Sequence, residues 1–154
     1  MNKTWFIDID GTLVKHLDNK DIAIGAKDEV LPYAKEFVEG IKKRGDIVVL
    51  ATARPEEFRG LTLRMLKKFG ISFDHILFDM GHMERVVVND IKPEGVYDGG
   101  VRDQDIPTAY DINMTSDEGF ARVLCKDLWE KPDSAKEKVF DLFDLEWFHG
   151  GVMG

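Results

Sequence analysis

The sequence predicts an α/β fold in which helices flank a parallel sheet. Two observations carry this prediction. Several short apolar runs end abruptly in polar residues, which is typical of parallel strands buried inside a sheet. A segment whose apolar residues recur at helical spacing follows the first of these runs, and another follows the second. Strands that alternate with helices along the chain favour a parallel sheet over an antiparallel one.

Three runs are the strongest strand candidates. Residues 5–7 precede Asp8 and have the character of a strand buried on both faces. Residues 47–51 and 86–88 are rich in β-branched side chains and stop at Thr52 and at Asn89–Asp90. Two weaker candidates are residues 75–78 and 108–112.

Two helices are predicted between the early strands. The first carries apolar residues at helical spacing between Ala34 and Ile41, with Pro32 suited to its first turn and Gly45 to its end. The second is opened by Pro55 and terminated by Gly70. Its apolar face comprises Phe58, Leu61, Met65, Leu66 and Phe69.

The pattern becomes helical again near the end of the sequence. Residues 115–118 have capping-box spacing and precede an apolar stripe, which predicts a helix of about 13 residues. Ser134 and Glu137 can cap a further helix beyond Pro132. We therefore expect one domain over residues 1–154, with a core of about 1–114 and a helical extension of about 115–150.

Composition narrows the possible partners. The 154 residues carry a net charge of -8, so large nucleic acids are unlikely partners. The single Cys125, with no apolar signal core at the start, favours a cytoplasmic protein, and no stretch is long and apolar enough to span a membrane. Aromatic residues between Phe140 and Phe148 could pack on the domain or form a homo-oligomer contact.

Polar residues follow all three strong strand candidates. In a parallel sheet the carboxyl ends of the strands face one edge, where ligand sites lie. Asp8, Thr52 and Asn89–Asp90 are therefore expected to converge. Carboxylates at two strand ends and a hydroxyl at a third indicate a functional site rather than a solvated surface.

These residues resemble the motifs of the haloacid dehalogenase superfamily. Its first motif is a hydrophobic strand followed by Asp-x-Asp-Gly-Thr, here Asp8-Ile9-Asp10-Gly11-Thr12. Its second is similar to residues 47–52, continued by Thr52-Ala53-Arg54, and its fourth to residues 86–90. The resemblance covers about residues 4–112 and implies a Rossmann-like parallel sheet.

The resemblance also implies roles for the acidic residues. Asp8 would attack phosphorus as the nucleophile, and Asp10 would protonate the leaving group and then activate water. Mg²⁺ would cancel the repulsion between Asp8 and the phosphate. Its ligands would be Asp8, the carbonyl of Asp10, and Asp90, with Asn89 able to offer a neutral oxygen.

The residues that would bind the phosphate match the family motifs less completely than the acidic residues do. Thr52, Ala53 and Arg54 correspond to the second motif and would hold phosphate oxygens through a hydroxyl and backbone N–H groups. The third motif should supply a Lys before the fourth strand, but no Lys lies between Lys68 and Lys92. Arg85 and Lys92 both remain candidates for this cation.

The resemblance implies a magnesium-dependent phosphomonoesterase working through an aspartyl-phosphate. Neither the interval before residue 47 nor the interval from 54 to 75 is long enough for a cap domain, so we expect a capless enzyme with an open site. A phosphorylated small molecule, such as a sugar or nucleotide phosphate, is the expected substrate. The alternatives are a polynucleotide 3′-phosphatase and an inactive binding or regulatory module.

Overall fold

The computed structural model describes residues 3–97, 100–102, 104–109 and 111–120. The chain divides into two compact units. The first, here called the core unit, comprises residues 3–80 and 114–120 of the described chain. The second comprises residues 81–113 and is called the 81–113 unit.

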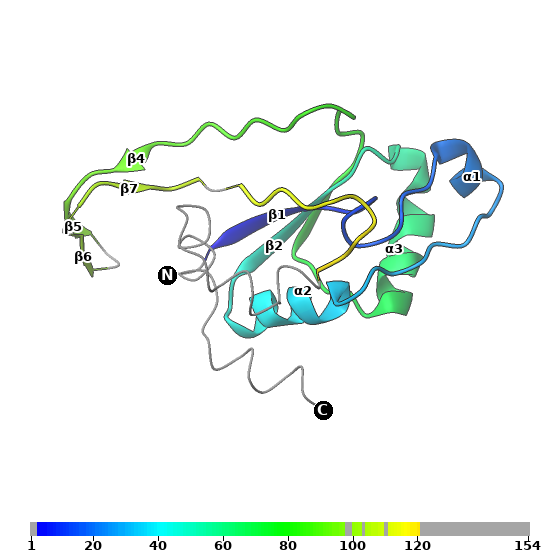
Figure 1. The fold of residues 1–154 in the computed structure, drawn as a ribbon, viewed down its shortest axis with the longest axis horizontal. Helices are drawn as coiled ribbons and strands as arrows, with labels where there is room; N and C mark the ends of the chain where they lie inside the picture. The colour runs from blue at the N-terminus through cyan, green and yellow to red at the C-terminus, as the bar shows by residue number, and fades with distance from the viewer. Residues whose placement is uncertain (1–2, 98–99, 103, 110, 121–154) are drawn as a thin grey trace. The chain divides into compact units, whose positions relative to one another are not determined.

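The core unit contains a three-stranded parallel sheet in the order β1-β2-β3 (Figure 1). Its strands are β1 (Thr4–Asp8), β2 (Ile47–Ala51) and β3 (His75–Leu77). In the register, Asp8 pairs with Ala51, and Ala51 pairs with Leu77, so all three strands end at one edge. The predicted parallel sheet and its first three strands are thus confirmed.

Helices connect these strands as the sequence predicts. Helix α2 (Ala34–Lys43) lies between β1 and β2, and it follows a short helix α1 (Asn19–Ala23) that the sequence did not predict. Between β2 and β3, the 3₁₀ turn η1 (Glu56–Phe58) leads into α3 (Arg59–Phe69). Helix α3 ends at Gly70 with φ +70°, a conformation that glycine adopts without strain.

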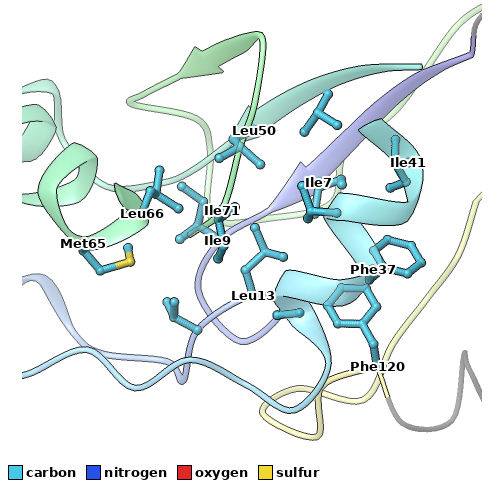
Figure 2. Close-up of a cluster of buried hydrophobic side chains, with 14 residues drawn as sticks. Ile7, Ile9, Leu13, Phe37, Ile41, Leu50, Met65, Leu66, Ile71 and Phe120 are labelled. Atoms are coloured by element: carbon cyan, nitrogen blue, oxygen red, sulfur yellow. The ribbon is translucent and has the colours of Figure 1, made fainter. Parts of the chain in front are cut away.

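One face of the sheet carries the hydrophobic core. Ile7 of β1 and Leu50 of β2 belong to a buried cluster with Phe37 of α2 and Leu66 of α3 (Figure 2). Side chains alternate between the two faces of a strand, so Phe6 points to the opposite face, where it is 61% exposed. The prediction that this strand is buried on both faces is therefore wrong.

The 81–113 unit is built from two short antiparallel pairs. Strand β4 (Ile91–Lys92) pairs with β7 (Ile106–Pro107), and β5 (Gly95–Tyr97) pairs with β6 (Gly100–Arg102). Neither predicted strand in this part of the chain is correct. Residues 86–88 lie outside every described strand, and the described residues of 108–112 follow β7.

The exposure of residues 86–88 explains why the prediction of a strand there failed. Val86 is 84% and Val88 is 92% exposed, so no neighbouring strand covers the run. Strand propensity reflects how well a side chain fits a partly buried, paired surface, and these valines lack such a surface in the structure.

The predicted C-terminal helices are only partly tested. Residues 115–118 lie in turns instead of opening a helix, and Asp117 has φ +62°. The carboxylate of Asp117 accepts from the backbone N–H of His16 at 2.7 Å, so it bonds a distant loop. The rest of the predicted extension, from residue 121, lies outside the described residues. In the described part of the chain, none of the helices has the length and apolar character needed to cross a membrane.

Candidate active site

The first motif forms a tight turn at the end of β1. The backbone carbonyl of Ile9 accepts from the N–H groups of Thr12, Leu13 and Val14 at 3.3, 2.9 and 3.0 Å. Ile9 is fully buried beneath the turn, whereas Asp8 and Asp10 on either side of it are half-buried. The apolar residue therefore anchors the turn and leaves the two carboxylates at its surface.

Gly11 allows this turn to form. Its φ is +82°, in the left-handed region that residues with a Cβ rarely adopt. A Cβ at this position would lie 2.7 Å from Oγ of Ser116, closer than nonbonded atoms normally approach. The positive φ therefore favours glycine in the turn that carries Asp8 and Asp10, and an added Cβ would require the Ser116 side chain to move.

The end of β2 lies beside this turn. Thr52 follows Ala51, the residue that pairs with Asp8, and its hydroxyl lies 3.4 Å from Oδ2 of Asp10. The same hydroxyl accepts from the backbone N–H of Arg54 at 3.1 Å. Thr52 is fully buried and Ala53 is half-buried. The predicted meeting of the first and second motifs is thus present in the core unit.

Arg54 makes the strongest contact with Asp10. Its Nε lies 2.9 Å from Oδ2 of Asp10, and its Nη2 lies 2.8 Å from Oδ1, so the carboxylate accepts two nearly parallel bonds. Such bidentate pairs fix the plane of a carboxylate as well as its position. Asp10 is therefore held by Arg54, with the hydroxyl of Thr52 nearby.

A second carboxylate, Asp28, binds the same guanidinium. Nη2 of Arg54 donates to Oδ1 of Asp28 at 2.5 Å, and Nη1 donates to the hydroxyl of Thr62 at 3.4 Å. Burial alone would lower the pKa of Arg54, but the hydrogen bonds and charges of Asp10 and Asp28 outweigh it and raise that pKa. The arginine is therefore firmly cationic.

Asp28 was not among the residues predicted from the sequence. It lies in a polar stretch between α1 and α2 and belongs to no motif. A buried arginine needs carboxylate partners, but its burial is not visible in the sequence, and more than one acidic residue in this stretch would satisfy that need.

The remaining predicted site residues belong to the 81–113 unit. Nδ2 of Asn89 donates to the carbonyl of Thr108 at 3.3 Å, and the hydroxyl of Thr108 donates to the carbonyl of Asp90 at 2.5 Å. Nζ of Lys92 forms an ion pair with Oδ2 of Asp90 at 2.5 Å. Arg85 is exposed. Asn89, Asp90 and Lys92 therefore form one hydrogen-bonded group within this unit.

The family model of haloacid dehalogenase-like hydrolases matches residues 5–81, which is half of the chain. The chain belongs to this family. The matched region contains the Asp8–Thr12 turn and the Thr52–Arg54 loop, whereas Arg85, Asn89, Asp90 and Lys92 lie beyond it. Neither the curated proteins nor the solved structures contain a match to the chain.

In this haloacid dehalogenase-like hydrolase, the donors near Asp8 suit a hard cation. The carboxylate of Asp8 and the backbone carbonyl of Asp10 are both oxygen ligands, the kind that Mg²⁺ prefers. Within the described residues, no three acidic, histidine or cysteine side chains are grouped closely enough to bind a metal. The donor chemistry of the core unit therefore fits magnesium, but supplies only part of a ligand set.

Proposed function

We propose that this hydrolase is a magnesium-dependent phosphomonoesterase that works through an aspartyl-phosphate on Asp8. The observation that carries the proposal is the geometry around Asp10. Two residues after the expected nucleophile, a carboxylate lies at a strand end, held by Arg54 at 2.8 Å and close to the Thr52 hydroxyl. This arrangement supports Asp10 as the proton donor for the group that leaves when Asp8 attacks.

In the first step, a carboxylate oxygen of Asp8 attacks phosphorus. The new bond joins that oxygen to phosphorus, and the bond from phosphorus to the leaving alkoxide oxygen breaks. The carboxyl group of Asp10 gives its proton to the alkoxide, which departs as an alcohol. The products of this step are the alcohol and phosphorylated Asp8.

In the second step, water hydrolyses the phosphorylated Asp8. Asp10, now a carboxylate, takes a proton from water while the water oxygen attacks phosphorus. The bond between phosphorus and the Asp8 oxygen breaks, which releases inorganic phosphate and restores both side chains. Asp10 therefore acts as acid in one step and as base in the next.

In the core unit, the carboxylate of Asp8 and the carbonyl of Asp10 would hold Mg²⁺, and by resemblance to the fourth motif Asp90 and Asn89 are proposed as further ligands. When bound, Mg²⁺ supplies positive charge that lets an anionic carboxylate approach an anionic phosphate. The Thr52 hydroxyl and the backbone N–H groups near Ala53 would bind phosphate oxygens, with Arg85 or Lys92 as the balancing cation. Both of these cations belong to the 81–113 unit.

The proposed substrate is a small phosphorylated metabolite, such as a sugar or nucleotide phosphate. The net charge of -8 disfavours a polynucleotide, whose phosphates the protein would repel. The intervals between β1 and β2 and between β2 and β3 contain only the helices already described, which supports a capless enzyme with an open site.

The test is a screen of phosphomonoesters with Mg²⁺, using Asp8→Asn as the control. We expect hydrolysis of at least one small ester and loss of at least about a thousandfold in the variant, since no nucleophile remains. Activity confined to a 3′-phosphorylated oligonucleotide would identify a polynucleotide phosphatase instead. No hydrolysis, together with no thermal stabilisation by beryllium fluoride and Mg²⁺, would indicate an inactive module.

A further inference from the structure

Arg54 is placed unlike a residue that binds substrate. Its side chain is only 1% exposed, and the carboxylates on either side of it, Asp10 and Asp28, are 15% and 16% exposed. All three guanidinium nitrogens donate to protein oxygens, those of Asp10, Asp28 and Thr62. Its burial and these bonds leave the guanidinium little access to a phosphate.

The three side chains come from separate parts of the core unit. Asp10 follows β1, Arg54 follows β2, and Asp28 lies in the loop that precedes α2. Nη2 of Arg54 bridges the two carboxylates, at 2.8 Å from Oδ1 of Asp10 and 2.5 Å from Oδ1 of Asp28. Asp10 and Asp28 therefore accept hydrogen bonds from the same guanidinium nitrogen.

The proposed role of Asp10 makes its orientation important. A proton donor must lie within hydrogen-bonding distance of the leaving oxygen, and small errors in placement can cost a large part of the rate. Thr52 offers Asp10 only a long contact, at 3.4 Å, so the bonds from Arg54 are the main restraint on the carboxylate.

We propose that Arg54 and Asp28 are positioning residues for the proton transfers of Asp10. In this arrangement Arg54 fixes the plane of the Asp10 carboxyl group, and Asp28 holds Arg54 in the orientation that does so. Neither residue contacts the substrate. This role rests on the proposed phosphatase function.

Two aryl phosphates of similar size provide the test. Phenyl phosphate releases a strongly basic leaving group that needs a proton, whereas 4-nitrophenyl phosphate releases a weakly basic one that does not. The ratio kcat/KM reports the first chemical step for both. Loss of correct proton donation should therefore lower kcat/KM for phenyl phosphate far more than for 4-nitrophenyl phosphate.

Asp28→Asn removes the charge that holds Arg54 and keeps the shape of the side chain. We expect kcat/KM for phenyl phosphate to fall by roughly tenfold or more, and by less than about threefold for 4-nitrophenyl phosphate. Glu29→Gln is the matched control, because Glu29 is the next residue and is exposed, with only a 4.0 Å ion pair to Lys15. Glu29→Gln should leave kcat/KM for each ester within about twofold of the wild-type value.

The outcomes separate the proposed role from the proposed function. If wild-type protein hydrolyses neither ester nor any other in the screen, the phosphatase assignment fails, and this role fails with it. If the wild type is active but Asp28→Asn lowers kcat/KM for both esters equally, Asp28 is only structural. If it changes neither value, Asp28 has no part in the reaction. In both cases the positioning role is wrong. Should Asp28→Asn not fold, Asp28→Glu keeps the charge but displaces the carboxylate, and it must show the same selective loss.

Discussion

The ring of Phe120 stacks on that of Phe37, with centroids 4.2 Å apart and an interplanar angle of 24°. Phe37 lies on α2, and Phe120 lies in the turn that brings residues 114–120 back into the core unit. The backbone N–H of Asp117, in the same turn, donates to the carbonyl of Gly11 at 2.9 Å. The stacked rings therefore secure a segment that supports the turn carrying Asp8 and Asp10.

Phe120→Ala should destabilise the protein by about 3 kcal/mol, because the ring is 1% exposed and its loss leaves a cavity beside Phe37. Denaturant unfolding of wild type and variant measures the difference. Phe6→Ala is the matched control, since Phe6 is 61% exposed. Equal losses for the two variants would show that the Phe37 contact contributes little.

Gly11→Ala should both destabilise the protein and lower its phosphatase activity. The added Cβ would meet Oγ of Ser116 at 2.7 Å and would force an alanine to adopt φ +82°. Gly25→Ala separates these effects, because Gly25 has φ +85° but no neighbour within 4 Å of a Cβ. We expect about 1 kcal/mol of loss for Gly25→Ala and at least twice that for Gly11→Ala.

The activities of these two glycine variants complete the comparison. Only Gly11→Ala should reduce kcat, because only Gly11 lies in the turn that carries Asp8 and Asp10. If Gly11→Ala keeps the wild-type kcat and the wild-type free energy of unfolding, the Ser116 segment accommodates the added methyl group without cost.

The sequence was sufficient to predict the sheet of the core unit and its helices α2 and α3, because each of these elements has a local signal. Strand β2 is an apolar, β-branched run that ends at a polar residue, and α3 lies between Pro55 and Gly70. The same reasoning failed at Val86–Val88, since a strand also requires a partner that local sequence does not specify.

Some residues of the candidate site could likewise be predicted from the sequence, and others could not. The meeting of Asp8 and Thr52 could be predicted because strand ends in a parallel sheet share an edge, and Asp10 could be predicted from the first motif. The pairing of Arg54 with Asp28 could not be, because it joins residues 26 positions apart in the sequence without a motif. Burial is what makes this pairing necessary, and burial of a single polar side chain is a tertiary property.

The ion pair between Lys42 and Asp74 gives a prediction for pH. Nζ of Lys42 lies 2.6 Å from Oδ2 of Asp74, and the backbone N–H of Val48 donates to the same oxygen at 2.8 Å. The hydrogen bond from Lys42, followed by that from Val48, lowers the pKa of Asp74 below its ordinary value of 3.8. Folding therefore favours the ionised form of Asp74.

A lowered pKa means that stabilisation is present above pH 3.8 and is lost as pH falls through the folded-state pKa. Asp74→Asn should therefore have a lower Tm than wild type at neutral pH, and the difference should shrink in acid, below about pH 4. Glu57→Gln, at an exposed acidic position on η1, serves as the control. A Tm difference that stays constant down to pH 3 would mean that the ionisation of Asp74 contributes nothing to stability.

The last prediction concerns the proposed magnesium ligands. Chelation of divalent ions should abolish phosphatase activity, and added Mg²⁺ should restore it. Asp90→Asn should raise the Mg²⁺ concentration needed for half-maximal activity by roughly tenfold or more, because a neutral amide replaces a charged ligand. Asn89→Ala should cause a smaller rise, since it removes a neutral oxygen.

Glu84→Gln provides the control for this titration, because Glu84 is an exposed acidic residue of the same unit. Lys92→Ala adds a second comparison, since Lys92 forms an ion pair with Asp90 at 2.5 Å. If Lys92 serves only to hold Asp90, its loss should shift the Mg²⁺ requirement and leave the KM for substrate unchanged. If Lys92 is the phosphate-balancing cation, Lys92→Ala should raise the KM for substrate at saturating Mg²⁺. If it changes neither the Mg²⁺ requirement nor KM, that role is assigned to Arg85.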